Sequence, residues 1–153
     1  MPYWLMKSEP DEFSIADLQK RLTARWDGVR NYQARNFLRA MAEGDAFFFY
    51  HSSCAVPGIA GIGRITRTAY PDPTALDGQS PYFDAKADEA SNPWSAVDVE
   101  FVEIFPRTLT LPQLKAEPAL AQMPLVRKGN RLSVMPVSLE EWAAILAMLP
   151  DRA

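Results

Sequence analysis

The chain has 153 residues, of which 48% are hydrophobic and 23% charged, with a formal net charge of −3, one cysteine and one histidine. This length and composition are typical of one folded domain, which we expect to span residues 1–153. A single cysteine excludes an internal disulfide and a zinc site made of cysteines, and we expect neither a metal nor a cofactor. The acidic balance argues against duplex binding driven by charge neutralisation alone.

The first third of the chain predicts two strands and two helices. Ser14 and Asn31 are good N-cap residues, because their side-chain oxygens accept hydrogen bonds from the first turn of a helix. The apolar run that ends at His51 is continuous, which is typical of a strand covered on both faces. In chain order we expect a strand at residues 3–7, a helix from 14 to about 22, a helix at 32–42 and a strand at 46–51.

The rest of the chain predicts three more strands, a long loop and two helices. Gly61 and Gly63 share one face of the first of these strands, which indicates strong bending or the close approach of another group. In chain order we expect strands at 58–70, 97–105 and 131–137, a loop at 69–93 and helices that begin after Thr110 and Ser138. This order of elements predicts an α+β fold around a curved sheet or a small β-barrel.

A basic segment lies between Lys20 and Arg39, where six basic residues are opposed by one acid, Asp27. Trp26 lies in this segment, outside the apolar faces of both predicted helices. It either caps the core or offers a surface on which a nucleic-acid base stacks. The nearby arginines are candidates for phosphate or base-edge contacts, although each alone is equally typical of a helix surface. These candidates are Arg25, Arg30, Arg35 and Arg39.

Three other groups of side chains are candidates to line a pocket. Residues 7–9 end the first strand and either pair with one another or present donors and acceptors to a ligand. His51 and Ser52 end the inner strand in the same way. In the long loop, Tyr82 or Phe83 either closes over a ligand or anchors the loop in the core.

The segment around His51 is also the place to look for catalysis, because a nucleophile needs a base within hydrogen-bond reach. Ser52, Ser53 and Cys54 follow it directly. Adjacent residues of a strand point to opposite faces, and no nucleophile elbow surrounds Ser53. We therefore predict no catalytic residue here.

Several spaced motifs over almost the whole chain resemble the EVE domain. They include YWLMKSEP at residues 3–10, WDGVRNY at 26–32, GIGR at 61–64, AYPD at 69–72 and RLSVMP at 131–136. The resemblance implies a PUA-like fold, a mixed β-barrel of about five or six strands surrounded by helices. In the similar YTH domains, an aromatic residue after the first helix forms one wall of a cage for a methylated base. That residue corresponds to Trp26, with Lys7 and Ser8 beside it, and the second aromatic of the cage corresponds to Tyr82 or Phe83.

The resemblance therefore implies a non-catalytic reader of DNA or RNA that carries a modified base, such as methylated or hydroxymethylated cytosine. We expect the protein to be a monomer. The predicted base pocket consists of Lys7, Ser8, Glu9, Trp26, Asn31, His51, Ser52, Tyr82 and Phe83. The predicted contacts to the nucleic-acid backbone are Arg25, Arg30, Arg35 and Arg39.

Two alternatives remain. An enzyme acting on a modified nucleotide or a small amide predicts a strongly perturbed pKa at Lys7, Glu9 or His51. A protein-interaction module predicts a large exposed apolar patch. The chain shows neither an export signal at its start nor an apolar run of the roughly 20 residues that span a bilayer, so we expect a cytoplasmic protein without a membrane partner.

Overall fold

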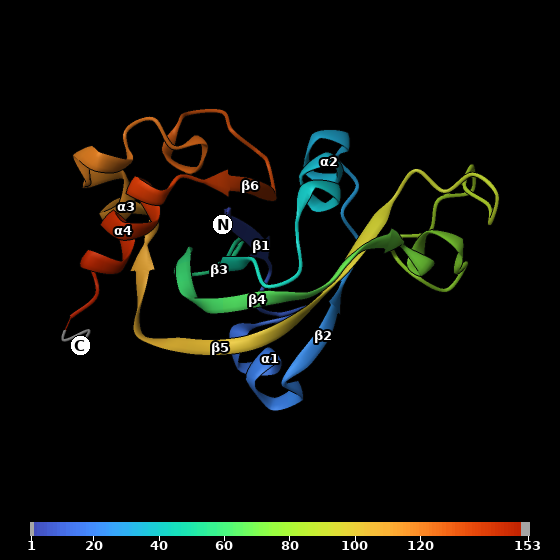
Figure 1. Cartoon of the computed structure of the whole chain (residues 1–153), viewed down its shortest axis with the longest axis horizontal. Helices are drawn as coiled ribbons and strands as arrows, with labels where there is room; N and C mark the ends of the chain where they lie inside the picture. The colour runs from blue at the N-terminus through green and yellow to red at the C-terminus, as the bar shows by residue number, and fades with distance from the viewer. Residues whose placement is uncertain (1, 151–153) are drawn as a thin grey trace.

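The computed structural model describes residues 2–150, which form one six-stranded sheet with four α-helices (Figure 1). The strands are β1 (Tyr3–Ser8), β2 (Thr23–Trp26), β3 (Ala46–His51), β4 (Gly58–Pro71), β5 (Ser95–Thr110) and β6 (Val134–Val137). The helices are α1 (Ile15–Arg21), α2 (Tyr32–Ala40), α3 (Leu111–Ala116) and α4 (Leu139–Ala147), with short 3₁₀ helices η1 (Pro73–Leu76), η2 (Pro118–Leu120) and η3 (Pro124–Val126). The predicted α+β class is confirmed.

The sheet is mixed and strongly curved, with the strand order β2-β5-β4-β3-β1-β6. Strands β1 and β3 are parallel, and the other neighbouring strands are antiparallel. The sheet is open rather than a closed barrel, because β2 and β6 are its two edges. Helix α2 contacts both β6 and β5, so a helix lies where a closed barrel would continue its strand pairing (Figure 1).

Glycines allow the bending of β4. A Cβ atom on Gly63 would lie 2.4 Å from the ring of Phe47, and one on Gly61 would lie 2.3 Å from the carbonyl oxygen of Glu103. The pairing of β4 with β5 also shifts register at these positions, as β-bulges do when they increase the local twist. The close approach that the sequence predicted at these two glycines is confirmed.

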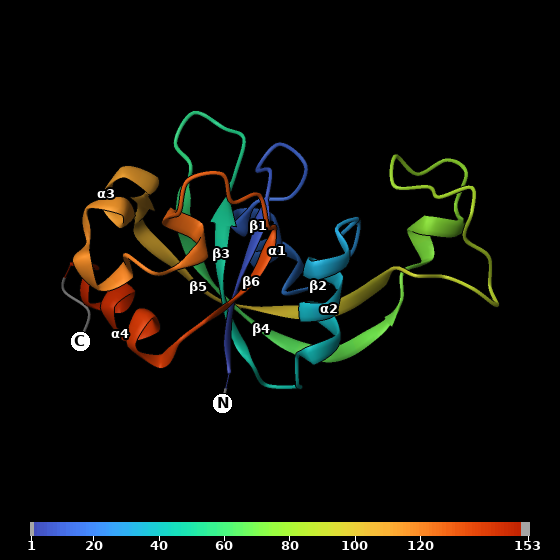
Figure 2. The ribbon, with the colours of Figure 1, turned by 90° about the horizontal axis from the view of Figure 1, so that it is seen from above.

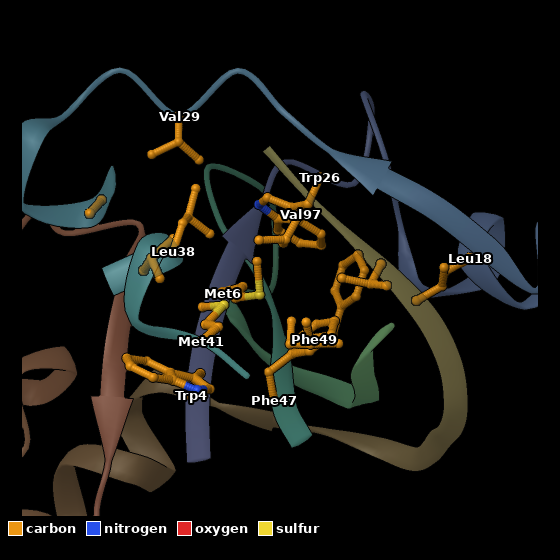
Figure 3. Packing of buried hydrophobic residues seen from close by; sticks show 14 of the residues in the cluster. Trp4, Met6, Leu18, Trp26, Val29, Leu38, Met41, Phe47, Phe49 and Val97 are labelled. Atoms are coloured by element: carbon orange, nitrogen blue, oxygen red, sulfur yellow. The ribbon is translucent and has the colours of Figure 1, made fainter. Parts of the chain in front are cut away.

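The two faces of the sheet are covered by separate cores. The α1/α2 core, which contains Trp4, Met6, Phe47 and Phe49, lies under helices α1 and α2 (Figure 3). The α3/α4 core contains Phe48 and lies under α3 and α4. Successive residues of a strand point to opposite faces, so the continuous apolar run of β3 serves both cores. The prediction of a strand covered on both faces is confirmed.

One strand was not predicted, and the start of another was placed too early. Strand β2 was not expected, because only Ala24 and Trp26 of its four residues are buried to any extent and such a short segment has no clear period. Its pairing with β5 defines it as a strand. The last strand begins at Val134 rather than at residue 131. The segment between β4 and β5 forms a separate lobe at the ends of these strands (Figure 2).

Candidate functional site

A cavity of about 820 Å³ opens where β1 and β2 end and α2 begins. The lobe between β4 and β5 supplies one of its walls through Tyr82. We call it the main cavity; it is lined by Lys7, Ser8, Glu9, Glu12, Phe13, Arg21, Trp26, Asp27, Gly28, Val29, Arg30, Asn31, Ser52, Ser53, Tyr82, Arg131 and Ser133. Its size lies within the range of small-molecule and nucleotide pockets.

The main cavity brings together most of the predicted base-pocket residues. Those that line it are Lys7, Ser8, Glu9, Trp26, Asn31, Ser52 and Tyr82. Two others are not among the residues that line it. The Nε2 atom of His51 accepts a hydrogen bond from the backbone amide of Ile15 at 3.1 Å, and the side chain of Phe83 is exposed on the lobe. A direct contact of any of these side chains with a base stays a prediction.

Trp26 forms the floor of the main cavity and belongs mostly to the core. Its side chain is only 6% exposed. Edge-to-face contacts place its ring centroid 5.7 Å from that of Phe47, 5.2 Å from that of Phe49 and 6.2 Å from that of Phe13. Figure 3 shows Trp26 in the same core as Phe47 and Phe49. Most of the Trp26 ring therefore caps the core, and only a small part of it faces the cavity.

Tyr82 forms a wall of the main cavity and is held from two sides. Its ring lies so close to Gly28 that a Cβ atom there would be 2.8 Å from it, and the φ angle of Gly28 is +77°. The Tyr82 hydroxyl donates a hydrogen bond to Glu12 Oε2 at 2.8 Å. Burial, followed by this bond to a carboxylate, raises the pKa of Tyr82 to about 12. The wall is therefore an uncharged, oriented aromatic ring.

Arg30 fastens the lobe to the start of α2. Its guanidinium donates to the Tyr82 carbonyl oxygen at 2.8 Å and 3.1 Å and to the carboxylate of Asp72 at 3.0 Å. The Asp72 side chain is fully buried and also accepts the Gly28 amide at 2.9 Å. Burial alone would raise the pKa of Asp72, but hydrogen bonds from Thr74, Gly28 and Arg30 outweigh burial and lower it. Arg30, predicted as a backbone contact, thus has its donors engaged within the protein.

The other predicted backbone contacts lie outside the main cavity. Arg25 pairs with Asp27 at 2.8 Å, while Arg35 and Arg39 donate to the Pro93 carbonyl oxygen at 3.0 Å and 3.1 Å. Each is therefore bound to the protein itself. Arg21 and Arg131 were not among the predicted contacts, although both line the cavity. The signal for Arg131 was present, since it opens the last motif shared with the EVE domain.

Lys7 is the cationic group at the end of β1. Its ammonium lies 5.7 Å from the centroid of the Tyr50 ring, and burial lowers its pKa. Among residues 2–150, the ion pairs are Arg25–Asp27, Arg30–Asp72 and Arg64–Glu100, so none involves Lys7. Its neighbour Ser8 donates its hydroxyl proton to the Phe13 carbonyl oxygen at 2.7 Å. The Lys7 ammonium is therefore a hydrogen-bond donor that a ligand in the cavity can use.

Residues 2–150 contain no group of three or more histidine, cysteine, aspartate or glutamate side chains placed to hold a metal ion. None of their helices combines the length and the apolar character that crossing a membrane requires.

The curved mixed sheet and its cavity place the chain in a known class. Residues 2–148 match the EVE domain family, and the chain belongs to that family. It is 47% identical to thymocyte nuclear protein 1 of Mus musculus over 165 residues, which cover 95% of this chain and 73% of the relative.

Two solved structures are especially informative. A protein from Pseudomonas syringae is 72% identical to this chain, with a TM-score of 0.94. The match covers 95% of this chain and 97% of that protein. The human THYN1 protein in complex with 5-methylcytosine containing DNA is 41% identical with a TM-score of 0.93, and 100% of both chains is covered. The fold predicted from the resemblance is therefore confirmed.

Proposed function

We propose that this protein is a non-catalytic reader that binds a modified base, methylated cytosine in DNA, in the main cavity. One observation carries the proposal: the human relative solved with 5-methylcytosine containing DNA shares the fold over the full length of both chains. The cavity adds physical support, because it combines an oriented aromatic wall with polar side chains from three separate segments.

The arrangement suits a base that has left its stack. Extracting a base from a duplex costs a few kcal/mol, and stacking on an aromatic side chain returns about 1–3 kcal/mol. Tyr82 is the better stacking partner, because Trp26 is buried among core rings whereas the Tyr82 ring is held at the cavity wall. Lys7 and Ser52 are then placed to address the polar edge of the base.

Binding without turnover agrees with the hydrogen bonds of His51 and of Ser8, whose side chain lines the main cavity. The Nε2 atom of His51, the ring nitrogen a general base would use, is occupied by the amide of Ile15. The hydroxyl proton of Ser8 is bonded to a backbone carbonyl. A general base must reach the proton that it removes, and neither group is arranged to activate the other.

The test uses two adjacent aromatic residues as a matched pair. We expect Tyr82→Ala to weaken binding of an oligonucleotide with one 5-methylcytosine by roughly 5- to 150-fold, the range that corresponds to a stacked base. Phe83→Ala, which removes an exposed ring next to it, should leave the affinity unchanged. Both affinities are measured by fluorescence anisotropy, with the same oligonucleotide carrying cytosine as the reference.

The proposal is wrong if the unaltered protein binds the two oligonucleotides equally. The proposed stacking on Tyr82 is wrong if Tyr82→Ala and Phe83→Ala change the affinity for the methylated oligonucleotide by the same factor. Circular dichroism of both variants shows that a loss of affinity does not come from a loss of fold.

A second candidate function is catalysis through Lys7, because burial lowers the pKa of this lysine inside the cavity. Such a shift raises the fraction of neutral amine, which is the form that acts as a nucleophile or a base. Incubation with 5-methylcytosine nucleosides and oligonucleotides, followed by mass spectrometry, separates the two functions. A product that disappears in Lys7→Met favours the enzyme, and unchanged substrate favours the reader.

A further inference from the structure

A second hollow continues from the main cavity along helix α2. It has a volume of about 430 Å³ and lies between the first turns of α2 and the segment that precedes and enters β6. We call it the side groove; it is lined by Asn31, Gln33, Phe37, Pro124, Gly129, Asn130, Arg131, Leu132 and Pro136. Asn31 and Arg131 line both hollows, so the two meet at these residues. Figure 1 shows β6 and the segment before it beside α2.

The segment that forms one side of the side groove is basic on an otherwise acidic protein, and of its three cations Arg131 lines the groove itself. Residues 118–139 contain Arg127, Lys128 and Arg131 and no aspartate or glutamate, whereas the whole chain has a net charge of −3. None of the three takes part in an ion pair among the described residues. Arg127 donates to the amide oxygen of Gln122 at 3.2 Å, which leaves its charge uncompensated. A local excess of this kind attracts an anionic partner.

The start of α2 adds to the positive potential at the junction of the two hollows. This nine-residue helix has Asn31 as its N-cap and no acidic residue in its first turn. The amino end of a helix carries a partial positive charge, which favours a nearby anion. Two independent features, the side-chain charge and the helix end, therefore act at the same place.

We propose that the side groove binds the sugar–phosphate backbone of the strand next to the base in the main cavity, with Arg131 contacting a phosphate at the junction. The inference rests on the proposed function, because a base held in the main cavity stays bonded to its neighbours and its strand must leave along the surface. The side groove adjoins that cavity at Asn31 and Arg131, and the apolar side chains of Phe37 and Leu132 line it where a sugar would pack. Phosphate contacts of this kind position a strand without reading its sequence.

The test measures how binding depends on salt. A single-stranded oligonucleotide with one 5-methylcytosine and its cytosine counterpart are titrated against the unaltered protein, Arg131→Gln and Arg131→Lys at several salt concentrations. Loss of one phosphate contact should reduce the slope of log K against log salt by about 0.7, which corresponds to roughly fourfold weaker binding at physiological salt. Arg131→Gln should show this loss for both oligonucleotides alike, and Arg131→Lys should restore the slope.

A matched control makes the result specific. Arg107→Gln removes another exposed arginine, on β5, that lines neither hollow and should leave the slope unchanged.

The outcomes separate this inference from the proposed function. If the protein prefers the methylated oligonucleotide but Arg131→Gln keeps the affinity and slope, the side-groove assignment is wrong and the reader stands. If the protein binds both oligonucleotides equally and Arg131→Gln still lowers the slope of log K against log salt, the side-groove assignment stands and the proposed reader function is wrong. If neither oligonucleotide binds, both are wrong.

Discussion

Tyr82 and Phe83 are adjacent aromatic residues of the same lobe, and the structure brings one of them to the main cavity. The backbone amide of Tyr82 donates to Ser80 Oγ at 3.0 Å, and its carbonyl oxygen is held by Arg30. These two bonds turn its ring toward Gly28, while the Phe83 ring is 48% exposed. The sequence alone does not distinguish the two residues, because a loop without a period does not determine which side chain points inward.

His51 is the one histidine of the chain, and its titration should show in the pH dependence of stability. Burial lowers the pKa of His51 below its ordinary value of 6.5, and its Nε2 atom accepts a hydrogen bond from Ile15 that protonation would break. The unfolded chain therefore takes up a proton before the folded protein does. We expect the free energy of unfolding to fall as the pH is lowered from about 7.5 to about 5.5.

The measurement combines urea denaturation across this range with the proton NMR titration of the single imidazole. His51→Gln, which keeps a hydrogen-bond acceptor, should lose this part of the pH dependence. An imidazole that titrates at or above its ordinary pKa would contradict the expectation.

At the scale of elements, the lobe between β4 and β5 and the start of α2 behave as one unit. Arg30 and Asp72 are 42 residues apart in the chain, yet their ion pair joins these elements at 3.0 Å. Glu12 and Tyr82, which are 70 residues apart, make a second connection at 2.8 Å. The lobe is thus fixed to the edge of the main cavity from two directions.

We expect Arg30→Ala to lower the free energy of unfolding by about 3 kcal/mol, because it leaves the buried carboxylate of Asp72 without its cation. Oligonucleotide binding should weaken as well, since the Tyr82 carbonyl oxygen loses its partner. Arg25→Ala is the matched control: it breaks an ion pair in which the arginine side chain is 44% exposed. Such a surface pair contributes about 0–1 kcal/mol. Urea denaturation of both variants measures the two losses in the free energy of unfolding. Equal losses would contradict the stabilising role of the Arg30–Asp72 ion pair.

At the scale of the whole molecule, the two cores share one sheet. Phe47 and Phe49 of β3 belong to the α1/α2 core, while Phe48 between them belongs to the α3/α4 core. Neither core can lose its packing without disturbing strands that the other core needs. The described chain should therefore unfold in a single cooperative transition, as small domains usually do.

Leu38 of α2 and Leu120 of η2 offer a matched pair for this prediction, because both are fully buried, one in each core. Changing either to alanine should lower the free energy of unfolding by about 2–5 kcal/mol. Both changes should shift the transitions seen by tryptophan fluorescence and by circular dichroism together. Separate transitions in either variant would show that the cores unfold independently.

Local sequence signals determined most of the elements of this protein. The caps at Ser14, Asn31 and Ser138 form as expected, and the apolar run of β3 predicts that both of its faces are buried. Such signals succeed because they depend on residues within one helical turn or one strand. The reading of a modified base came from the family resemblance and not from these patterns.

The tertiary structure alone decided how the site is built. It placed Trp26 mostly in the core, engaged Arg30 with Asp72 and brought Arg131 to the junction of the main cavity and the side groove. It also decided between the two forms that the order of elements allowed, a curved sheet and a small barrel, by leaving the sheet open at β2 and β6. Each of these outcomes depends on contacts between segments far apart in the chain. Local periodicity and capping carry no information about such contacts. The contacts depend on how the curved sheet brings distant segments together.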